Sequence, residues 1–175
     1  ARGQAQAQAV ARALAEVPLR ASYASPLDRT METAQPLARL KGIQIVPRPG
    51  LGEIQPGRWQ GQPLKSLRRR KLWPVIQFTP SLARFPDGES FAEAQSRIAA
   101  ELEELRHRHP KDTIACFSHA DMIKLAVAHY LGLPLDLYQR LSISPGSISV
   151  LSITDTMIRV LRVNECSAAE QAVAG

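Results

Sequence analysis

The feature of this chain that most restricts its fold is an uninterrupted apolar run at residues 113–117 (TIACF), with a helical pattern over 120–131 directly after it. A strand without alternating polar residues is typical of a parallel sheet that other elements cover on both faces. Parallel strands need long crossover connections, which are usually helices. The run therefore predicts a layered α/β fold.

Two further segments are predicted to be helical. Residues 4–17 are rich in Gln and Ala, which are good helix formers, and apolar residues recur in them at helical spacing. A long helix is expected from about Ser90 to His109. Its apolar face comprises Phe91, Ala94, Ile98, Leu102 and Leu105.

Another helix is expected to begin at Ser25 and Pro26, because a serine can cap a helix and a proline fits its first turn. It should end near Lys41 and Gly42. Strands are predicted at 19–24, 43–46, 113–117, 148–153 and 157–163, the last two forming a hairpin around Asp155. This order predicts a three-layer α/β/α sandwich with a mostly parallel central sheet.

The domain organisation is expected to be simple. A chain of 175 residues with 45% hydrophobic residues can bury one core, so residues 1–165 are predicted to form a single domain. Residues 62–89 are punctuated by prolines and have too little apolar content for a core of their own, which predicts a lid-like excursion. Residues 166–175 are small and polar and are expected to form a flexible tail.

The net charge of +6, carried mostly by arginine, points to anionic partners. Arg68 to Lys71 form a basic run, but no aromatic residues alternate with it, so a solvated face is favoured over nucleic-acid binding. No apolar stretch is long enough to span a membrane, and no export signal is visible at residue 1. The separated Cys116 and Cys166 fit a reducing, cytoplasmic setting.

Two strand-to-helix junctions carry candidate functional residues. Arg29 lies in the first turn of one predicted helix, and His119 begins another. The helix dipole opposes positive charge at a helix N-terminus, so an anion bound between these side chains would explain both. Two alternatives stay open: Arg29 could pair with Asp28 or Glu32, and His119 could be a neutral, hydrogen-bonded core residue.

Glu53 lies in a glycine-rich loop, LGEIQPGRWQG, that begins at Leu51. A carboxyl group near a bound phosphate has a raised pKa, because like charge disfavours ionisation, and it can then act as a general acid. The alternative is an ordinary loop glutamate in water. His107, His109 and His129 are interpreted as structural, and the sequence contains no metal-ligand cluster and no nucleotide-binding glycine motif.

These residues stand in motifs that resemble those of the histidine phosphatase superfamily, also called the phosphoglycerate mutase-like family. Residues 1–7 (ARGQAQA) are similar to its "x-x-Gly-x-x-Gln-Ala" helix start. Residues 25–34 (SPLDRTMETA) are similar to its "Ser-Pro-Leu-x-Arg-x-x-x-Thr-Ala" signature. Residues 53–61, 85–90 and 118–120 resemble its acid-bearing loop, its "Pro-x-Gly-Glu-Ser" helix start and its second-histidine motif. Five motifs in the family order make the match specific.

The chain departs from the family in two places. The "Arg-His-Gly" triplet, which carries the phosphorylated nucleophile of the family, does not occur in these 175 residues. We expect it in an N-terminal segment of roughly 20–30 residues, one strand and its connection, that precedes Ala1. A truncated, inactive protein is the alternative. Ala120 replaces a common glycine, and its backbone N–H can still reach a phosphate.

The resemblance implies a phosphomonoesterase that acts on a small phosphorylated metabolite through a phosphohistidine, without a metal or cofactor. Glu53 and His119 are then the catalytic residues. Arg29, Ser25 and the backbone of Ala120 are the substrate-binding residues. No nucleic-acid or membrane partner is expected, and a homodimer is left open.

Two other functions also stay open. The first is a phosphoglycerate mutase, an isomerase that keeps water out of its site; the modest length of the excursion favours a phosphatase. The second is a non-catalytic phosphate-binding module, which is what the chain would be if no nucleophile precedes Ala1.

Overall fold

The computed structural model describes residues 2–166, and at its centre lies a parallel sheet. Strand β1 (Leu19–Ala24) lies between β2 (Ile45–Pro47) and β3 (Thr113–Phe117) in this three-stranded sheet. In the register of the sheet, Ser22 is opposite Ile45 on one side and Ala115 on the other. The predicted parallel arrangement, with 113–117 as a strand, is confirmed.

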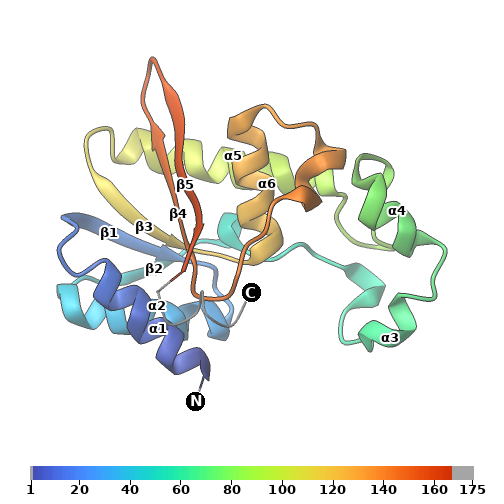
Figure 1. The fold of residues 1–175 in the computed structure, drawn as a ribbon, viewed down its shortest axis with the longest axis horizontal. Coiled ribbons are helices and arrows are strands. Elements are labelled where there is room, and N and C mark those ends of the chain that lie inside the picture. The colour runs from blue at the N-terminus through green and yellow to red at the C-terminus, as the bar shows by residue number, and fades with distance from the viewer. Residues whose placement is uncertain (1, 167–175) are drawn as a thin grey trace.

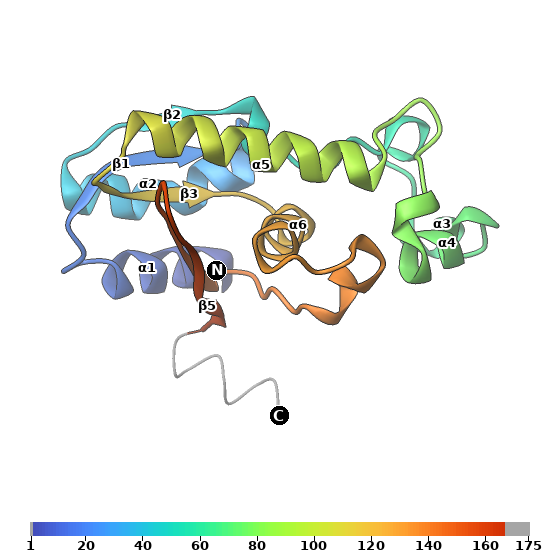
Figure 2. The ribbon, with the colours of Figure 1, turned by 90° about the horizontal axis from the view of Figure 1, so that it is seen from above.

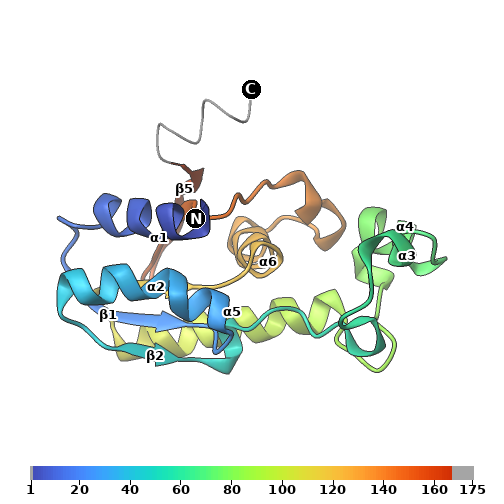
Figure 3. The same ribbon diagram turned by 90° about the horizontal axis from the view of Figure 1, so that it is seen from below.

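Helices cover both faces of this sheet (Figure 1). Helices α1 (Arg2–Ala13) and α2 (Asp28–Lys41) lie on one face, and α5 (Phe91–Arg108) lies on the other. Figures 2 and 3 show the same layers from two further directions, with α6 (Ala120–Leu131) beside α5. The fold is therefore the predicted α/β/α sandwich.

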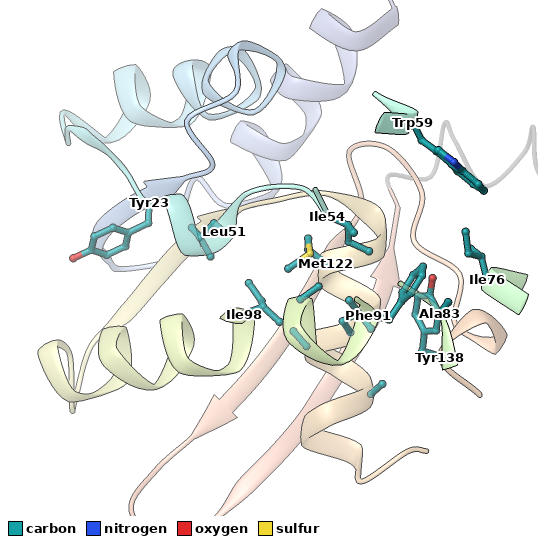
Figure 4. Close-up of a cluster of buried hydrophobic side chains, with 14 of the residues drawn as sticks. Tyr23, Leu51, Ile54, Trp59, Ile76, Ala83, Phe91, Ile98, Met122 and Tyr138 are labelled. Atoms are coloured by element: carbon teal, nitrogen blue, oxygen red, sulfur yellow. The ribbon is translucent and has the colours of Figure 1, made fainter. Parts of the chain in front are cut away.

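Alternating side chains of β1 supply the two cores of the sandwich. Ala24 joins a cluster between the sheet and helices α1 and α2, together with Leu37 and Phe117. Tyr23 points to the opposite face and joins the larger cluster with side chains of α5 and α6, which Figure 4 shows. This alternation is what a strand covered on both faces requires.

The hairpin at the C-terminal end is also confirmed. Strands β4 (Ile148–Ile153) and β5 (Ile158–Glu165) pair antiparallel in a sheet of their own. Their turn closes with a hydrogen bond from Thr154 N to Met157 O at 2.9 Å. The predicted tail at 166–175 lies outside the described residues, except for Cys166.

Two helix ends differ from the prediction. Helix α1 ends at Ala13 instead of 17, because the chain tightens into a turn from Ala15 N to Arg12 O, and Pro18 disfavours a helical residue before it. Ser25 does not cap α2, so that prediction is wrong. The cap position is Leu27, whose side chain makes no capping bond, and Ser25 serves another purpose described below.

The long helix begins as its sequence suggests. Ser90 and Glu93 form a capping box at the start of α5, with Ser90 Oγ accepting from Glu93 N at 3.2 Å and Glu93 Oε2 accepting from Ser90 N at 2.9 Å. The predicted apolar face is buried, with Phe91, Ala94, Ile98 and Leu105 almost fully covered. The capping box thus determines the residue at which α5 begins.

The 62–89 segment is partly helical, with short helices α3 (Leu64–Leu67) and α4 (Leu72–Phe78). Short 3-10 helices lie in the loops of the described chain, with three residues each at Pro49–Leu51, Gly57–Trp59 and Pro80–Leu82 and six residues at Leu135–Arg140. Figure 1 shows α3 and α4 at the end of the molecule remote from β1. Arg68 to Lys71 are exposed between these two helices.

A row of aromatic rings attaches the 62–89 segment and the turn before it to the main core. Trp59 packs on Phe85 at 5.5 Å between ring centroids, Phe85 on Phe91 at 5.6 Å, and Phe91 on Tyr138 at 5.5 Å. All four belong to, or pack against, the same core cluster, of which Figure 4 shows Trp59, Phe91 and Tyr138. None of the helices in the described part of the chain is long and apolar enough to span a membrane.

Candidate active site

The predicted site residues come together where two helices begin. Arg29 lies in the first turn of α2, and His119 is the N-cap residue of α6. Neither helix start has a side-chain cap, so the first N–H groups of each remain available to a ligand. Parallel strands β1 and β3 end side by side, which brings both helix starts to one edge of the sheet.

Three of the predicted side chains are in direct contact. Arg29 Nη2 lies 3.0 Å from His119 Nδ1 and 3.5 Å from Glu53 Oε2. His119 Nδ1 is itself 3.5 Å from Glu53 Oε2. Arg29 therefore pairs with Glu53 rather than with Asp28 or Glu32, the alternatives on its own helix.

The contacts of His119 show which ring nitrogen carries the hydrogen. A guanidinium only donates hydrogen bonds, so Nδ1 must accept from Arg29, and the hydrogen of a neutral ring then lies on Nε2. That Nε2–H donates to Ser25 Oγ at 2.8 Å. Burial, with the charges of Arg29 and Arg97 adding to it, lowers the pKa of His119 to about 4. The imidazole is neutral in the absence of an anion.

Ser25 supports His119 instead of capping α2. Its side chain is completely buried, and its Oγ also accepts a weak bond from Leu27 N at 3.4 Å. Its backbone is fixed from both directions, because Ser25 N donates to Phe117 O and Thr30 Oγ1 donates to Ser25 O, both at 2.9 Å. The oxygen that receives the His119 hydrogen is therefore held rigidly.

Glu53 lies partly exposed in the loop between two 3-10 turns. Its Oε1 accepts from the N–H of Ile54 at 3.1 Å, while burial raises the pKa of its carboxyl group above the ordinary value, with the charge of Asp121 adding to the rise. The raised pKa was predicted from a bound phosphate, but the structure produces it by desolvation without any ligand. Among residues 2–166, no three His, Cys, Asp or Glu side chains gather as metal ligands would.

The remaining predicted positions are Ala120, which lies at the site, and the three histidines interpreted as structural. Ala120 is the first residue of α6 and is exposed, so its N–H is accessible at the site. The interpretation of His109 as structural agrees with its contacts, since its ring lies 2.7 Å from Tyr23 Oη and 3.0 Å from Asp112 Oδ2. Within the part of the chain that the structure describes, His107 and His129 have no hydrogen bond to a predicted site residue.

The sequence analysis assigned no role to three residues that shape the site. Arg97 donates to the carbonyl oxygen of Glu53 at 3.1 Å, Ser118 Oγ donates to Leu51 O at 2.7 Å, and Asp121 acts on the Glu53 carboxyl by its charge. No local pattern could have predicted these contacts, because each of them joins residues that are far apart in the chain.

Known proteins resemble this chain over most of its length. Residues 1–166 match the model of the histidine phosphatase superfamily, branch 1. "Phosphoserine phosphatase 1" of Hydrogenobacter thermophilus is 28% identical over 165 residues, which are 93% of this chain and 78% of that protein. A "Probable phosphoglycerate mutase GpmB" of Photorhabdus laumondii is 31% identical over 150 residues, 84% of this chain and 69% of that protein.

Solved structures agree with the fold. YhfR of Bacillus stearothermophilus superimposes with a TM-score of 0.89 at 23% identity, covering 94% of this chain and 83% of the other. A mycobacterial glucosyl-3-phosphoglycerate phosphatase superimposes with a TM-score of 0.82 at 22% identity, covering 93% and 84%. The five motifs, the α/β/α sandwich and the match over residues 1–166 lead to one conclusion: the chain belongs to branch 1 of the histidine phosphatase superfamily.

Proposed function

We propose that this protein is a metal-independent phosphomonoesterase that acts on small phosphorylated metabolites. The observation that carries the proposal is the meeting of Arg29, Glu53 and His119 within 3.5 Å at two uncapped helix starts. A guanidinium, an imidazole and free N–H groups supply the donors that a phosphate dianion needs. A carboxyl group with a raised pKa beside them supplies a proton for the leaving group.

In the proposed reaction, a histidine that precedes Ala1 attacks phosphorus in line and forms an N–P bond as the ester P–O bond breaks. Arg29, the N–H of Ala120 and a protonated His119 bind the oxygens that gain charge, with Ser25 in contact behind His119. Glu53 donates its proton to the departing alkoxide. The Glu53 carboxylate then takes a proton from the water that hydrolyses the phosphohistidine.

Two observations test whether a histidine nucleophile precedes Ala1. Translating the gene upstream of Ala1 should give a strand that ends in Arg-His-Gly. The natural full-length protein, incubated briefly with a ³²P-labelled phosphomonoester, should then carry label that survives alkali and is released by acid. If the gene does not encode Arg-His-Gly upstream of Ala1, or if the protein takes up no label, the protein is a non-catalytic phosphate-binding module.

The roles in this chain are tested by substitution in the full-length protein. Hydrolysis of an aryl phosphate should continue in excess chelator, and His119→Gln should lower kcat about 10²–10³-fold, the usual loss for one donor to a developing oxyanion. His129→Gln on the same helix is the matched control, because His129 is exposed and makes no bond to the site. Equal rates for the two variants would refute the role of His119.

The resemblance to a protein named as a probable phosphoglycerate mutase supports a second candidate, an isomerase. A phosphatase releases inorganic phosphate from 3-phosphoglycerate or from other monoesters, whereas a mutase converts 3- to 2-phosphoglycerate with little release. Following both products by ³¹P NMR in one sample distinguishes them. We expect release, because the 62–89 segment is short for a cover that must keep water out of the site, and one relative is named as a phosphoserine phosphatase.

A further inference from the structure

Arg97 of α5 holds the loop that carries Glu53 through hydrogen bonds to the backbone of the loop. The Arg97 side chain is only 22% exposed. Its Nη1 donates to Gly50 O at 3.0 Å and to Gly52 O at 2.9 Å, and its Nη2 donates to Glu53 O at 3.1 Å. One guanidinium therefore fixes three carbonyl groups in the four residues that end at Glu53.

Glu89 completes this arrangement. Its Oε1 accepts from Arg97 Nε at 2.8 Å and its Oε2 accepts from Arg97 Nη2 at 2.9 Å, a bidentate pair in which the carboxylate is 11% exposed. Glu89 Oε2 also accepts from Gln55 N at 3.2 Å, on the far side of Glu53. The pair thus holds the loop both before and after the carboxyl residue.

The same guanidinium reaches the helix that carries His119. Arg97 Nη2 lies 3.7 Å from Sδ of Met122, a fully buried residue in the first turn of α6. A second contact joins the loop to the start of α6, because Ser118 Oγ, next to His119, donates to Leu51 O at 2.7 Å. The position of the Glu53 carboxylate relative to His119 therefore depends on contacts that Arg97 makes.

Only arginine can make all of these contacts. Its planar fork directs N–H groups along three edges at once, whereas the single ammonium of lysine cannot bridge Glu89 and three carbonyl oxygens. We propose that Arg97, with Glu89, is a positioning residue that sets where the Glu53 carboxyl group meets the leaving group of the substrate. This inference rests on the proposed function and adds to it a residue that touches no substrate.

The effect of a misplaced Glu53 carboxyl group on the rate depends on the leaving group of the substrate. An alkyl phosphate needs the Glu53 proton as its P–O bond breaks, while a nitrophenolate leaves without one. A misplaced Glu53 therefore slows the alkyl substrate and spares the aryl substrate. General damage to the fold slows both alike. The ratio of the two kcat/KM values, which report only the formation of the phosphohistidine and not its hydrolysis, therefore separates positioning from stability.

The experiment compares glycerol phosphate with p-nitrophenyl phosphate in the full-length protein. We expect Arg97→Lys and Glu89→Gln each to lower kcat/KM for the alkyl substrate about tenfold or more, with kcat/KM for the aryl substrate changed less than about twofold. Arg48→Lys is the matched control. Arg48 also pairs with a buried carboxylate of α5, with Nε 2.5 Å from Glu101 Oε1, and it should leave the ratio unchanged.

Glu53→Gln identifies the origin of the effect. It should produce the same selective loss, and adding Arg97→Lys to it should lower the alkyl-to-aryl ratio no further. An Arg97→Lys protein that loses both activities equally, or neither, would overturn the inference while the proposed function stands. If the wild-type protein hydrolyses neither substrate, or Glu53→Gln shows no selectivity, the proposed function has failed instead.

A second measurement does not depend on activity. Titration of the ¹³C-labelled Glu53 carboxyl group by NMR should show its pKa falling towards the ordinary value in Arg97→Lys and in Glu89→Gln, because a released loop exposes the group to water. Arg48→Lys should leave it raised. An unchanged Glu53 pKa in both loop variants would overturn the inference.

Discussion

The side chain of Arg29 donates to His119 Nδ1 across 3.0 Å, so the guanidinium and the neutral imidazole are joined by a bond that protonation of His119 would break. A neutral His119 lets both residues lie together while the site is empty. A phosphate dianion offers each of them a better partner than the other. Binding of an anion and protonation of His119 are therefore coupled.

The first prediction concerns this coupling. The pKa of His119, lowered to about 4 in the empty site, should rise strongly when inorganic phosphate binds, because the dianion favours the imidazolium. Long-range ¹H–¹⁵N NMR spectra report the protonation of each ring at a series of pH values. His129, exposed on the same helix, is the internal control, and phosphate should leave its NMR signals in place. Bound phosphate that leaves the His119 titration in place would contradict the coupling.

The second prediction follows from the same lowered pKa. Between about 4 and the ordinary value of 6.5, unfolded chains bind a proton at His119 that the folded protein does not. The contribution of His119 to the free energy of unfolding is therefore full above 6.5 and is lost as the pH falls towards 4. Urea midpoints measured across this range should decline less steeply for His119→Gln than for the wild type. Parallel curves would show that His119 titrates normally in the folded state.

Much of the fold could be predicted because it depends on local chemistry. The apolar run at 113–117, the serine before Phe91 and the glycine after Lys41 each determine an element by short-range rules, and each is confirmed. The motif residues Arg29 and His119 could also be placed, since both follow strands that end at one edge of the sheet.

What the sequence could not provide depends on contacts between distant segments. Ser25 precedes a helix and has the right chemistry for a cap, but a histidine 94 positions away uses its oxygen. Arg97 is 44 residues from Glu53, and nothing between them signals that the guanidinium will reach its carbonyl group. The raised pKa of Glu53 has the same origin, because burial follows from packing and not from the neighbours of Glu53 in the chain.

The third prediction compares two glycines near the Glu53 loop. Gly57 and Gly61 both have a positive φ, of 52° and 71°, which costs any other residue about 1 kcal/mol or more. A Cβ at Gly57 would also lie 2.2 Å from Pro86 O, while a Cβ at Gly61 meets nothing within 4 Å. Gly57→Ala should therefore lower the free energy of unfolding well beyond Gly61→Ala, by urea denaturation. Equal losses would mean that the loop can shift away from Pro86.

The last prediction uses two buried serines that differ in their partners. Ser25 Oγ accepts the Nε2–H of His119, so Ser25→Ala leaves that buried donor unsatisfied and should lower the free energy of unfolding by about 1–3 kcal/mol. Ser22 is equally buried, and its Oγ has no hydrogen-bond partner among the residues that the structure describes. Ser22→Ala should therefore be neutral or stabilising.

Urea midpoints at pH 7 measure the stability of both serine variants. The imidazole NMR signals of His119 give a second readout. In Ser25→Ala the Nε2–H loses its acceptor, so the imidazole signals of His119 should shift, whereas in Ser22→Ala they should not move. If Ser22→Ala is the more damaging change, Ser22 Oγ has a partner in the folded protein and the role given to Ser25 fails. If Ser25→Ala alone destabilises the protein, the buried oxygen behind His119 is what holds the imidazole towards Arg29.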